Sequence, residues 1–162
     1  MTAVNKRALF LYLSFALFLL LRLVYAVAFG AGVVPSDDSF AYNLYAVKIL
    51  ESPHWYLSND FGAHGREPGY PLFLALIYLV FGKENFIAVH ITQAFISLGT
   101  VVMIARLAYR FFDRKAAYIA LFWSGLHVFY IYYCGTLIRE TLIVFLITGM
   151  FYLLSGIRSG FL

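Results

Sequence analysis

Four long apolar runs constrain this chain more than any other feature of its sequence. They are residues 8–29, 86–105, 116–138 and 141–157. Apart from Arg22, they contain no Asp, Glu, Lys or Arg. A helix needs about 20 apolar residues to cross the roughly 30 Å hydrocarbon core of a bilayer. The runs therefore predict an all-α integral membrane protein, with spans at about residues 8–29, 86–108, 115–134 and 138–157.

The composition supports this class. Hydrophobic residues make up 63% of the 162 residues and charged residues only 12%, whereas charged residues are about 25% of a typical soluble domain. The 20% aromatic content excludes a disordered chain, and the single cysteine, Cys134, excludes a disulfide scaffold. The basic residues are scattered or flank the apolar runs, so we take them as topology signals and expect no nucleic-acid partner. Residues 1–162 are interpreted as one membrane module.

A fifth apolar run, residues 68–82, decides the topology. If it spans the membrane, the basic cluster at 106–115 shares a side with the acidic segment after the first span, against the positive-inside bias. If it lies at the interface, or enters and leaves the membrane on one face, both termini and that cluster are cytoplasmic and residues 30–85 lie outside. We expect four spans in this orientation, in a cytoplasmic or inner membrane or one of the endoplasmic reticulum type; five spans are the alternative.

The outer segment is predicted to contain two juxtamembrane surface helices. Ser36 or Asp37 can cap the first, and apolar residues then recur at helical spacing through residues 39–50. The second begins at Pro68 or Pro71, because proline is tolerated in the first turn of a helix, and runs to about residue 81.

Asp38 is the first candidate for chemistry. It follows the first span and would sit at the start of a surface helix, with Tyr42 on the same face one turn later. A helix N-terminus stabilises a carboxylate, and without further context the favoured interpretation is that Asp37 and Asp38 simply cap the helix.

Glu140 is the second candidate, since it lies between two apolar runs at the predicted outer boundary. An ionisable residue there is a functional hypothesis by default. The alternative is that Glu140 caps the last span while the adjacent Arg139 extends to the lipid headgroups.

Three further charged residues belong to the candidate substrate site. Arg22, in the outer half of the first span, can meet an anionic group or extend to the interface. Arg66 and Glu67 can line an outer pocket or form an exposed ion pair. An acid-lined outer cavity would allow a carboxylate to act as general base while a phosphate leaves from an activated sugar. Arg66, Arg139 and Arg22 are the groups available to stabilise that phosphate.

Histidines provide only a weak metal signal. His54 and His64, with Asp60, can bind a divalent metal, but their spacing matches no strict site. His90 and His127 lie within spans, where hydrogen-bonded core histidines are the more common case. We therefore assign no cofactor and no metal ligand, and a divalent metal stays possible.

Several segments, in order, resemble the GT-C glycosyltransferases, in particular the protein mannosyltransferase and aminoarabinose transferase branch. The segments are Asp38 to Tyr42 with Ala46, Arg66 to Leu76, Phe81-Gly82, Val89 to Ala94, Arg110 to Lys115, Tyr132-Tyr133 and Leu137 to Leu142. The resemblance implies an enzyme that transfers a sugar, with inversion, from a polyprenyl-phosphate donor to an acceptor on the outer face. It also implies two juxtamembrane helices in the first outer loop.

The resemblance assigns roles to individual residues. It implies that Asp38 is the catalytic aspartate with Tyr42 in register, although Ser39 stands where the family has a second acid. It implies that Glu140 is the acid at the outer end of a later span. The charged residue before the loop proline corresponds to Glu67 or Arg66.

The chain departs from the family in length, because family members have more spans after this region. We therefore expect an N-terminal GT-C module that needs further spans or another membrane subunit, in contact with membrane lipids. A truncated chain, a split enzyme and a degenerate copy kept as a non-catalytic subunit of a larger complex all fit the sequence.

Overall fold

The computed structural model describes residues 3–30, 37–52 and 67–158. Every regular element in these ranges is helical and none is a strand, which confirms the all-α prediction for them. In chain order the elements are α1 (Ala3–Gly30), α2 (Asp37–Glu51), α3 (Gly69–Phe81), α4 (Phe86–Phe111), α5 (Arg114–Gly125), α6 (Val128–Tyr132), the 3-10 helix η3 (Tyr133–Gly135) and α7 (Glu140–Arg158).

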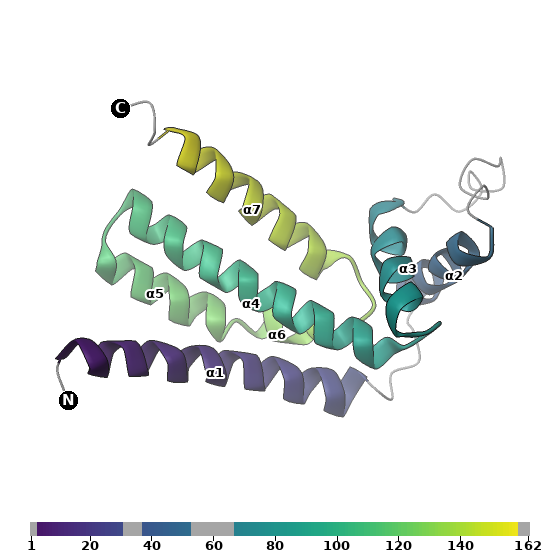
Figure 1. The fold of residues 1–162 in the computed structure, drawn as a ribbon, viewed down its shortest axis with the longest axis horizontal. Helices are drawn as coiled ribbons and strands as arrows, with labels where there is room; N and C mark the ends of the chain where they lie inside the picture. Colours follow the sequence, from purple (N-terminus) through teal and green to yellow (C-terminus); the bar gives the residue numbers. More distant parts are fainter. Residues whose placement is uncertain (1–2, 31–36, 53–66, 159–162) are drawn as a thin grey trace.

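The helices form an elongated bundle with a cap at one end. α4 lies in the middle and contacts α1, α5 and α7, while α2 packs against α3. Figure 1 shows α2 and α3 at one end of the bundle, and the start of α1, the turn between α4 and α5 and the end of α7 at the other. We call the helix pair α2 and α3 the end cap. The helices predicted over 39–50 and 68–81 are confirmed as these two elements.

Two helices are long and apolar enough to cross a membrane, α1 over Lys6–Ala28 and α4 over Phe86–Phe111. A third span exists only if α5 and the segment Val128–Gly135 are taken together, and a 50° bend separates them. α7 is a shorter apolar helix. The expected continuous span over 115–134 is therefore broken, and four spans stay a prediction.

Close packing accompanies the break after α5. A Cβ atom on Gly125 would lie 2.5 Å from the ring of Phe18 on α1, so only glycine allows this approach. The Ser124 hydroxyl also donates to the carbonyl of Ala120 at 2.6 Å, a local bond that often bends a helix. Hydrophobicity alone does not report such a turn, which is why the sequence predicted one uninterrupted helix.

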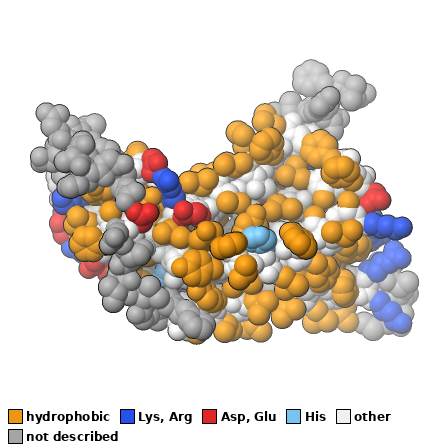
Figure 2. Space-filling model, turned by 180° about the vertical axis from the view of Figure 1, so that it is seen from behind, with side chains coloured by type: hydrophobic (Ala, Val, Ile, Leu, Met, Phe, Trp, Pro, Cys, Tyr) orange, Lys and Arg blue, Asp and Glu red, His pale blue; other side chains and the backbone are white. Residues whose placement is uncertain are grey.

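The exterior separates apolar from charged side chains. Figure 2 shows hydrophobic side chains across the middle of one face, Lys and Arg gathered at one end, and acidic with basic groups at the other. Large hydrophobic residues such as Trp123 and Leu79 are 77% and 72% exposed. Such an exposed apolar surface in water would favour aggregation, so this exterior suggests a membrane protein.

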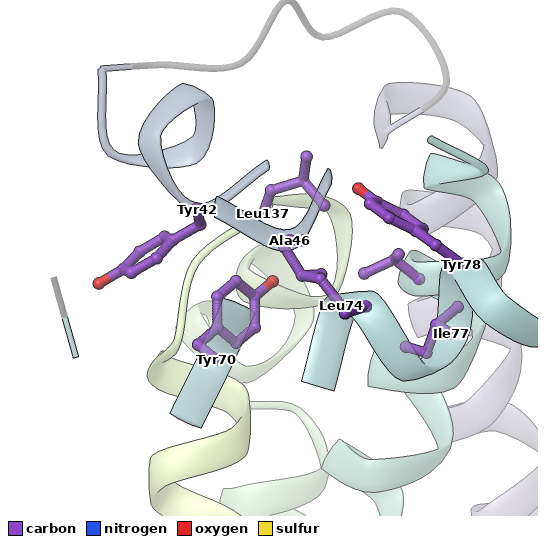
Figure 3. Close-up of a cluster of buried hydrophobic side chains, with 9 residues drawn as sticks. Tyr42, Ala46, Tyr70, Leu74, Ile77, Tyr78 and Leu137 are labelled. Atoms are coloured by element: carbon purple, nitrogen blue, oxygen red, sulfur yellow. The ribbon is translucent and has the colours of Figure 1, made fainter. Parts of the chain in front are cut away.

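The end cap has its own hydrophobic core (Figure 3). Its buried members are Tyr42 and Ala46 of α2, Tyr70, Leu74, Ala75, Ile77 and Tyr78 of α3, Val89 of α4, and Leu137. At its edge the Tyr78 hydroxyl donates to Asn43 Oδ1 at 2.7 Å, and Asn43 Nδ2 donates to Glu84 Oε1 at 2.7 Å. Because Leu137 belongs to this core, the end cap is attached to the connection that leads into α7.

We predict that Gly125→Ala destabilises the protein by about 1–3 kcal/mol, because the added methyl group must displace the Phe18 ring. Gly149→Ala in α7 is the control, since its Cβ would meet only the Met103 side chain, at ordinary distances of 3.7 Å to Sδ and 3.9 Å to Cε. The measurement is the free energy of unfolding in detergent. Equal stability of the two variants would contradict the packing argument.

Candidate functional site

Five polar or aromatic residues from the end cap, the residues just before α3 and the start of α7 lie close together. They are Tyr42, Glu67, Tyr70, Arg139 and Glu140, and we call them the end-cap site. Glu67 and Arg139 form an ion pair. The rings of Tyr42 and Tyr70 meet edge to face with 5.0 Å between centroids. Residues from α2, the start of α3 and the start of α7 thus meet at one end of the bundle.

The Glu67–Arg139 pair is open to solvent, with side chains that are 65% and 36% exposed. Exposed ion pairs contribute at most about 1 kcal/mol to stability, so this pair is a weak reason for the fold. From the sequence, we expected Glu67 to line a pocket or to form an exposed ion pair with Arg66. Its observed partner, Arg139, lies much later in the sequence. The ion pair therefore joins two of the segments that resemble the family.

Tyr70 is held in position by a hydrogen bond to α4. Its hydroxyl donates to Gln93 Oε1 at 2.8 Å, and Gln93 Nε2 donates to the carbonyl of Thr136 at 2.8 Å. Burial raises the pKa of the Tyr70 hydroxyl well above its ordinary value, and the neighbouring Tyr78, Glu140 and Tyr42 add to the rise. Tyr70 therefore stays a neutral donor at physiological pH.

Glu140 is the first residue of α7, and its Oε2 atom is buried without a hydrogen-bond partner. The hydroxyl of the next residue, Thr141, is in the same state. Both side chains line a cavity of about 90 Å³, together with Ser97, Thr100, Tyr130, Tyr133 and Val144. Since a water molecule occupies about 30 Å³ in the liquid, this cavity is the size of a few waters and smaller than a sugar.

Asp38 lies in the first turn of α2, exposed to solvent, one turn before the buried Tyr42. This position suits a helix-capping acid and a general base equally, so both interpretations stay open. Asp37 begins the same helix. Arg66 lies outside the described residues.

The two histidines that the structure describes differ in their hydrogen bonding. His90 is buried and its Nδ1 atom lies 3.1 Å from the carbonyl oxygen of Cys134, as expected of a core histidine. His127 differs, because it stands at the break between α5 and α6 and its buried Nδ1 atom has no hydrogen-bond partner. The described ranges contain no group of three or more His, Cys, Asp or Glu that could hold a metal. The weak metal prediction at His54, Asp60 and His64 lies outside those ranges.

Arg22 does not extend to an interface, contrary to one expectation, because it is fully buried inside the bundle. Its guanidinium group donates to Ser97 Oγ at 3.0 Å and to the carbonyl oxygens of Phe18 and Gly125 at 3.0 and 2.9 Å. A fourth, longer contact reaches the carbonyl of Ser124 at 3.4 Å. These bonds occupy most of the donors of Arg22, which argues against a role in binding a donor phosphate.

A row of polar residues lies on α4. Part of it falls in a segment that resembles the family, but we assigned the row no role from the sequence. We call His90, Gln93, Ser97 and Thr100 the polar stripe of α4; all four are buried. Ser97 donates to the carbonyl of Tyr130 at 3.1 Å. Their spacing of three and four residues places them on one helix face, so the pattern was available in the sequence.

No family model, curated protein or solved structure matches this chain. The end-cap site has a partly exposed guanidinium group paired with Glu67, a carboxylate with one unsatisfied oxygen and, on the same helix as Tyr42, an exposed aspartate. This set can bind an anionic group and accept a proton.

We predict that Arg22→Met lowers the free energy of unfolding by more than about 2 kcal/mol, because it leaves the buried carbonyl of Gly125 and the Ser97 hydroxyl without their donor. Arg7→Met at the exposed start of α1 is the control for loss of one positive charge. The milder Ser97→Ala, with an expected loss of about 1 kcal/mol, serves if Arg22→Met does not fold. Wild-type stability of both interior variants would refute the structural role.

We predict that stability falls as the pH rises above 10.0, the ordinary pKa of tyrosine. The unfolded chain releases the Tyr70 proton there while the folded protein retains it, so alkaline pH favours unfolding. Tyr70→Phe should flatten this decline, whereas phenylalanine at the exposed Tyr109 should not. Denaturant unfolding between pH 8 and 11 measures the slopes. A slope unchanged by Tyr70→Phe would exclude this linkage.

Proposed function

We propose that this chain is the N-terminal membrane module of a GT-C-like glycosyltransferase, which moves a sugar from a polyprenyl-phosphate donor to an acceptor on the outer membrane face. The observation that supports it best is the ion pair between Glu67 and Arg139 beside Tyr42 and Tyr70. Three of the segments that resemble the family, far apart in sequence, supply these residues. Further spans, in this polypeptide or another, would complete the donor and acceptor sites.

The proposed orientation has both termini in the cytoplasm and the end cap outside. α1, α4, the α5–η3 pair and α7 would be the four spans. Exposed Lys6, Arg7, Arg114 and Lys115 lie near the bundle end opposite α2 and α3, and positive residues favour the cytoplasmic side. α2 and α3 would then lie on the outer membrane surface.

In the proposed reaction Asp38 removes the proton from the acceptor hydroxyl as its oxygen attacks the anomeric carbon of the sugar. The bond to the phosphate oxygen breaks, and polyprenyl phosphate leaves with the electron pair. Arg139, with Arg66, would stabilise the leaving phosphate. Glu140 would shape the acceptor side, and Asp37, Tyr42 and Glu67 would line the same site.

One observation favours a second candidate, a non-catalytic membrane subunit derived from this fold. The cavity at Glu140 has a volume of only about 90 Å³, so this carboxylate does not face a space for a sugar in this arrangement. Under this alternative the exposed apolar helices would be contact surface for a larger complex.

We predict that Asp38→Asn abolishes sugar transfer, with a loss of at least about 100-fold, because asparagine preserves the capping ability and shape of the side chain but is no base. The assay is transfer from radiolabelled undecaprenyl-phosphate mannose or aminoarabinose in membranes that contain the complete enzyme. Asp113→Asn is the matched control and should keep activity, because Asp113 also caps a helix but lies in the turn between α4 and α5, far from the end cap.

Full transfer by Asp38→Asn would reject this residue as the base. An inactive Asp37→Asn with active Asp38→Asn would move the assignment by one residue. Absence of transfer by the wild-type assembly from either donor would favour the non-catalytic subunit.

A further inference from the structure

A large groove on the described part of the protein lies far from the end-cap site. It has a volume of about 730 Å³ and runs between α1, α4 and α5. Its apolar lining consists of Leu11, Phe15, Leu98, Val102, Ala105, Ala117 and Leu121, and its remaining lining residues are Arg106, Tyr109, Arg114 and Tyr118. The arginines lie close to the turn between α4 and α5, whereas Leu98 and Leu121 lie about two turns deeper in the bundle.

The two arginines of the groove have no acidic partner among the described residues. Both side chains are exposed, and Arg114 lies over the ring of Tyr118 at 5.9 Å. Asp113, the acid in the turn between the helices, accepts a hydrogen bond from the backbone of Ala116 and caps α5. Arg110, by contrast, donates to the carbonyl of Tyr152 on α7. Arg106 and Arg114 thus present positive charge that no carboxylate of the described residues neutralises.

An apolar groove with two unpaired guanidinium groups at one end matches an anionic amphiphile. Its hydrocarbon chain would cover the leucines and phenylalanine, and its phosphate would accept hydrogen bonds from both arginines. Basic pockets between helices on the cytoplasmic side commonly bind anionic headgroups. A purely apolar helix in this groove would leave two charges facing it, and a free phosphate would leave the apolar walls exposed.

We propose that this groove binds one anionic phospholipid of the inner leaflet, with an acyl chain between α1, α4 and α5 and its phosphate on Arg106 and Arg114. The proposal needs α1 and α4 to lie in a membrane, as their length and hydropathy support. The assignment to the inner leaflet rests on the proposed orientation, but lipid binding in the groove does not depend on sugar transfer, so each activity can fail without the other.

The test is lipid retention measured by native mass spectrometry on the full protein, purified in micelles that contain equal amounts of phosphatidylglycerol and phosphatidylcholine. We expect the wild type to retain phosphatidylglycerol with at least about tenfold preference, and the double variant Arg106→Gln, Arg114→Gln to lose that preference. Loss of Arg114 should not harm folding, because a positive charge at the start of α5 opposes the helix dipole.

The matched control is Arg7→Gln with Lys115→Gln, which removes the same charge from the same end without touching the groove. It should keep the preference; an equal loss in both double variants would overturn the site in favour of general surface charge. Ala105→Trp, which fills the groove, should displace the lipid while both arginines remain. Retention of lipid by Ala105→Trp, or displacement of it by millimolar inorganic phosphate, would show that the acyl groove is not the site.

Discussion

The rest of the structure depends on the hydrogen bonds between the polar stripe of α4 and the broken segment after α5. Inside a bilayer no water is available for freed carbonyl groups, so irregular backbone survives only where protein donors reach it. Gln93 donates to the carbonyls of Tyr133, Cys134 and Thr136, and Ser97 donates to that of Tyr130. Arg22 supplies the donors for Gly125 and Ser124 from the other side.

The same donors determine where the candidate site forms. Because Gln93 also accepts a hydrogen bond from the Tyr70 hydroxyl, one side chain fixes both the end cap and the connection that leads to Arg139 and Glu140. The break also positions Leu137. Because the apolar run does not continue as one helix after α5, the chain reaches the end cap and Leu137 packs into its core. A continuous helix through residues 115–134 would have no such carbonyls for Gln93 to bind.

Hydrophobic runs were sufficient to predict an all-helical chain and both end-cap helices, because length and periodicity are local properties. They could not predict the break, since Gly125 is required by the ring of Phe18, a residue more than a hundred positions away. The burial of Arg22 was missed for a related reason: two of its partners, the carbonyls of Gly125 and Ser124, lie at the end of α5, where the helix breaks. The pairing of Glu67 with Arg139 was equally invisible, although both residues had been selected as candidates.

The central claim, that Gln93 holds α3 and the start of α7 in one arrangement, is tested most directly by an electron-paramagnetic-resonance distance measurement in lipid nanodiscs. Spin labels at Leu76 on α3 and Leu146 on α7 suit this, because both positions are exposed and the native Cys134 is buried. The account predicts one narrow distance distribution for the otherwise wild-type protein and a broad or shifted one for Gln93→Leu. An unchanged narrow distribution in Gln93→Leu would contradict it.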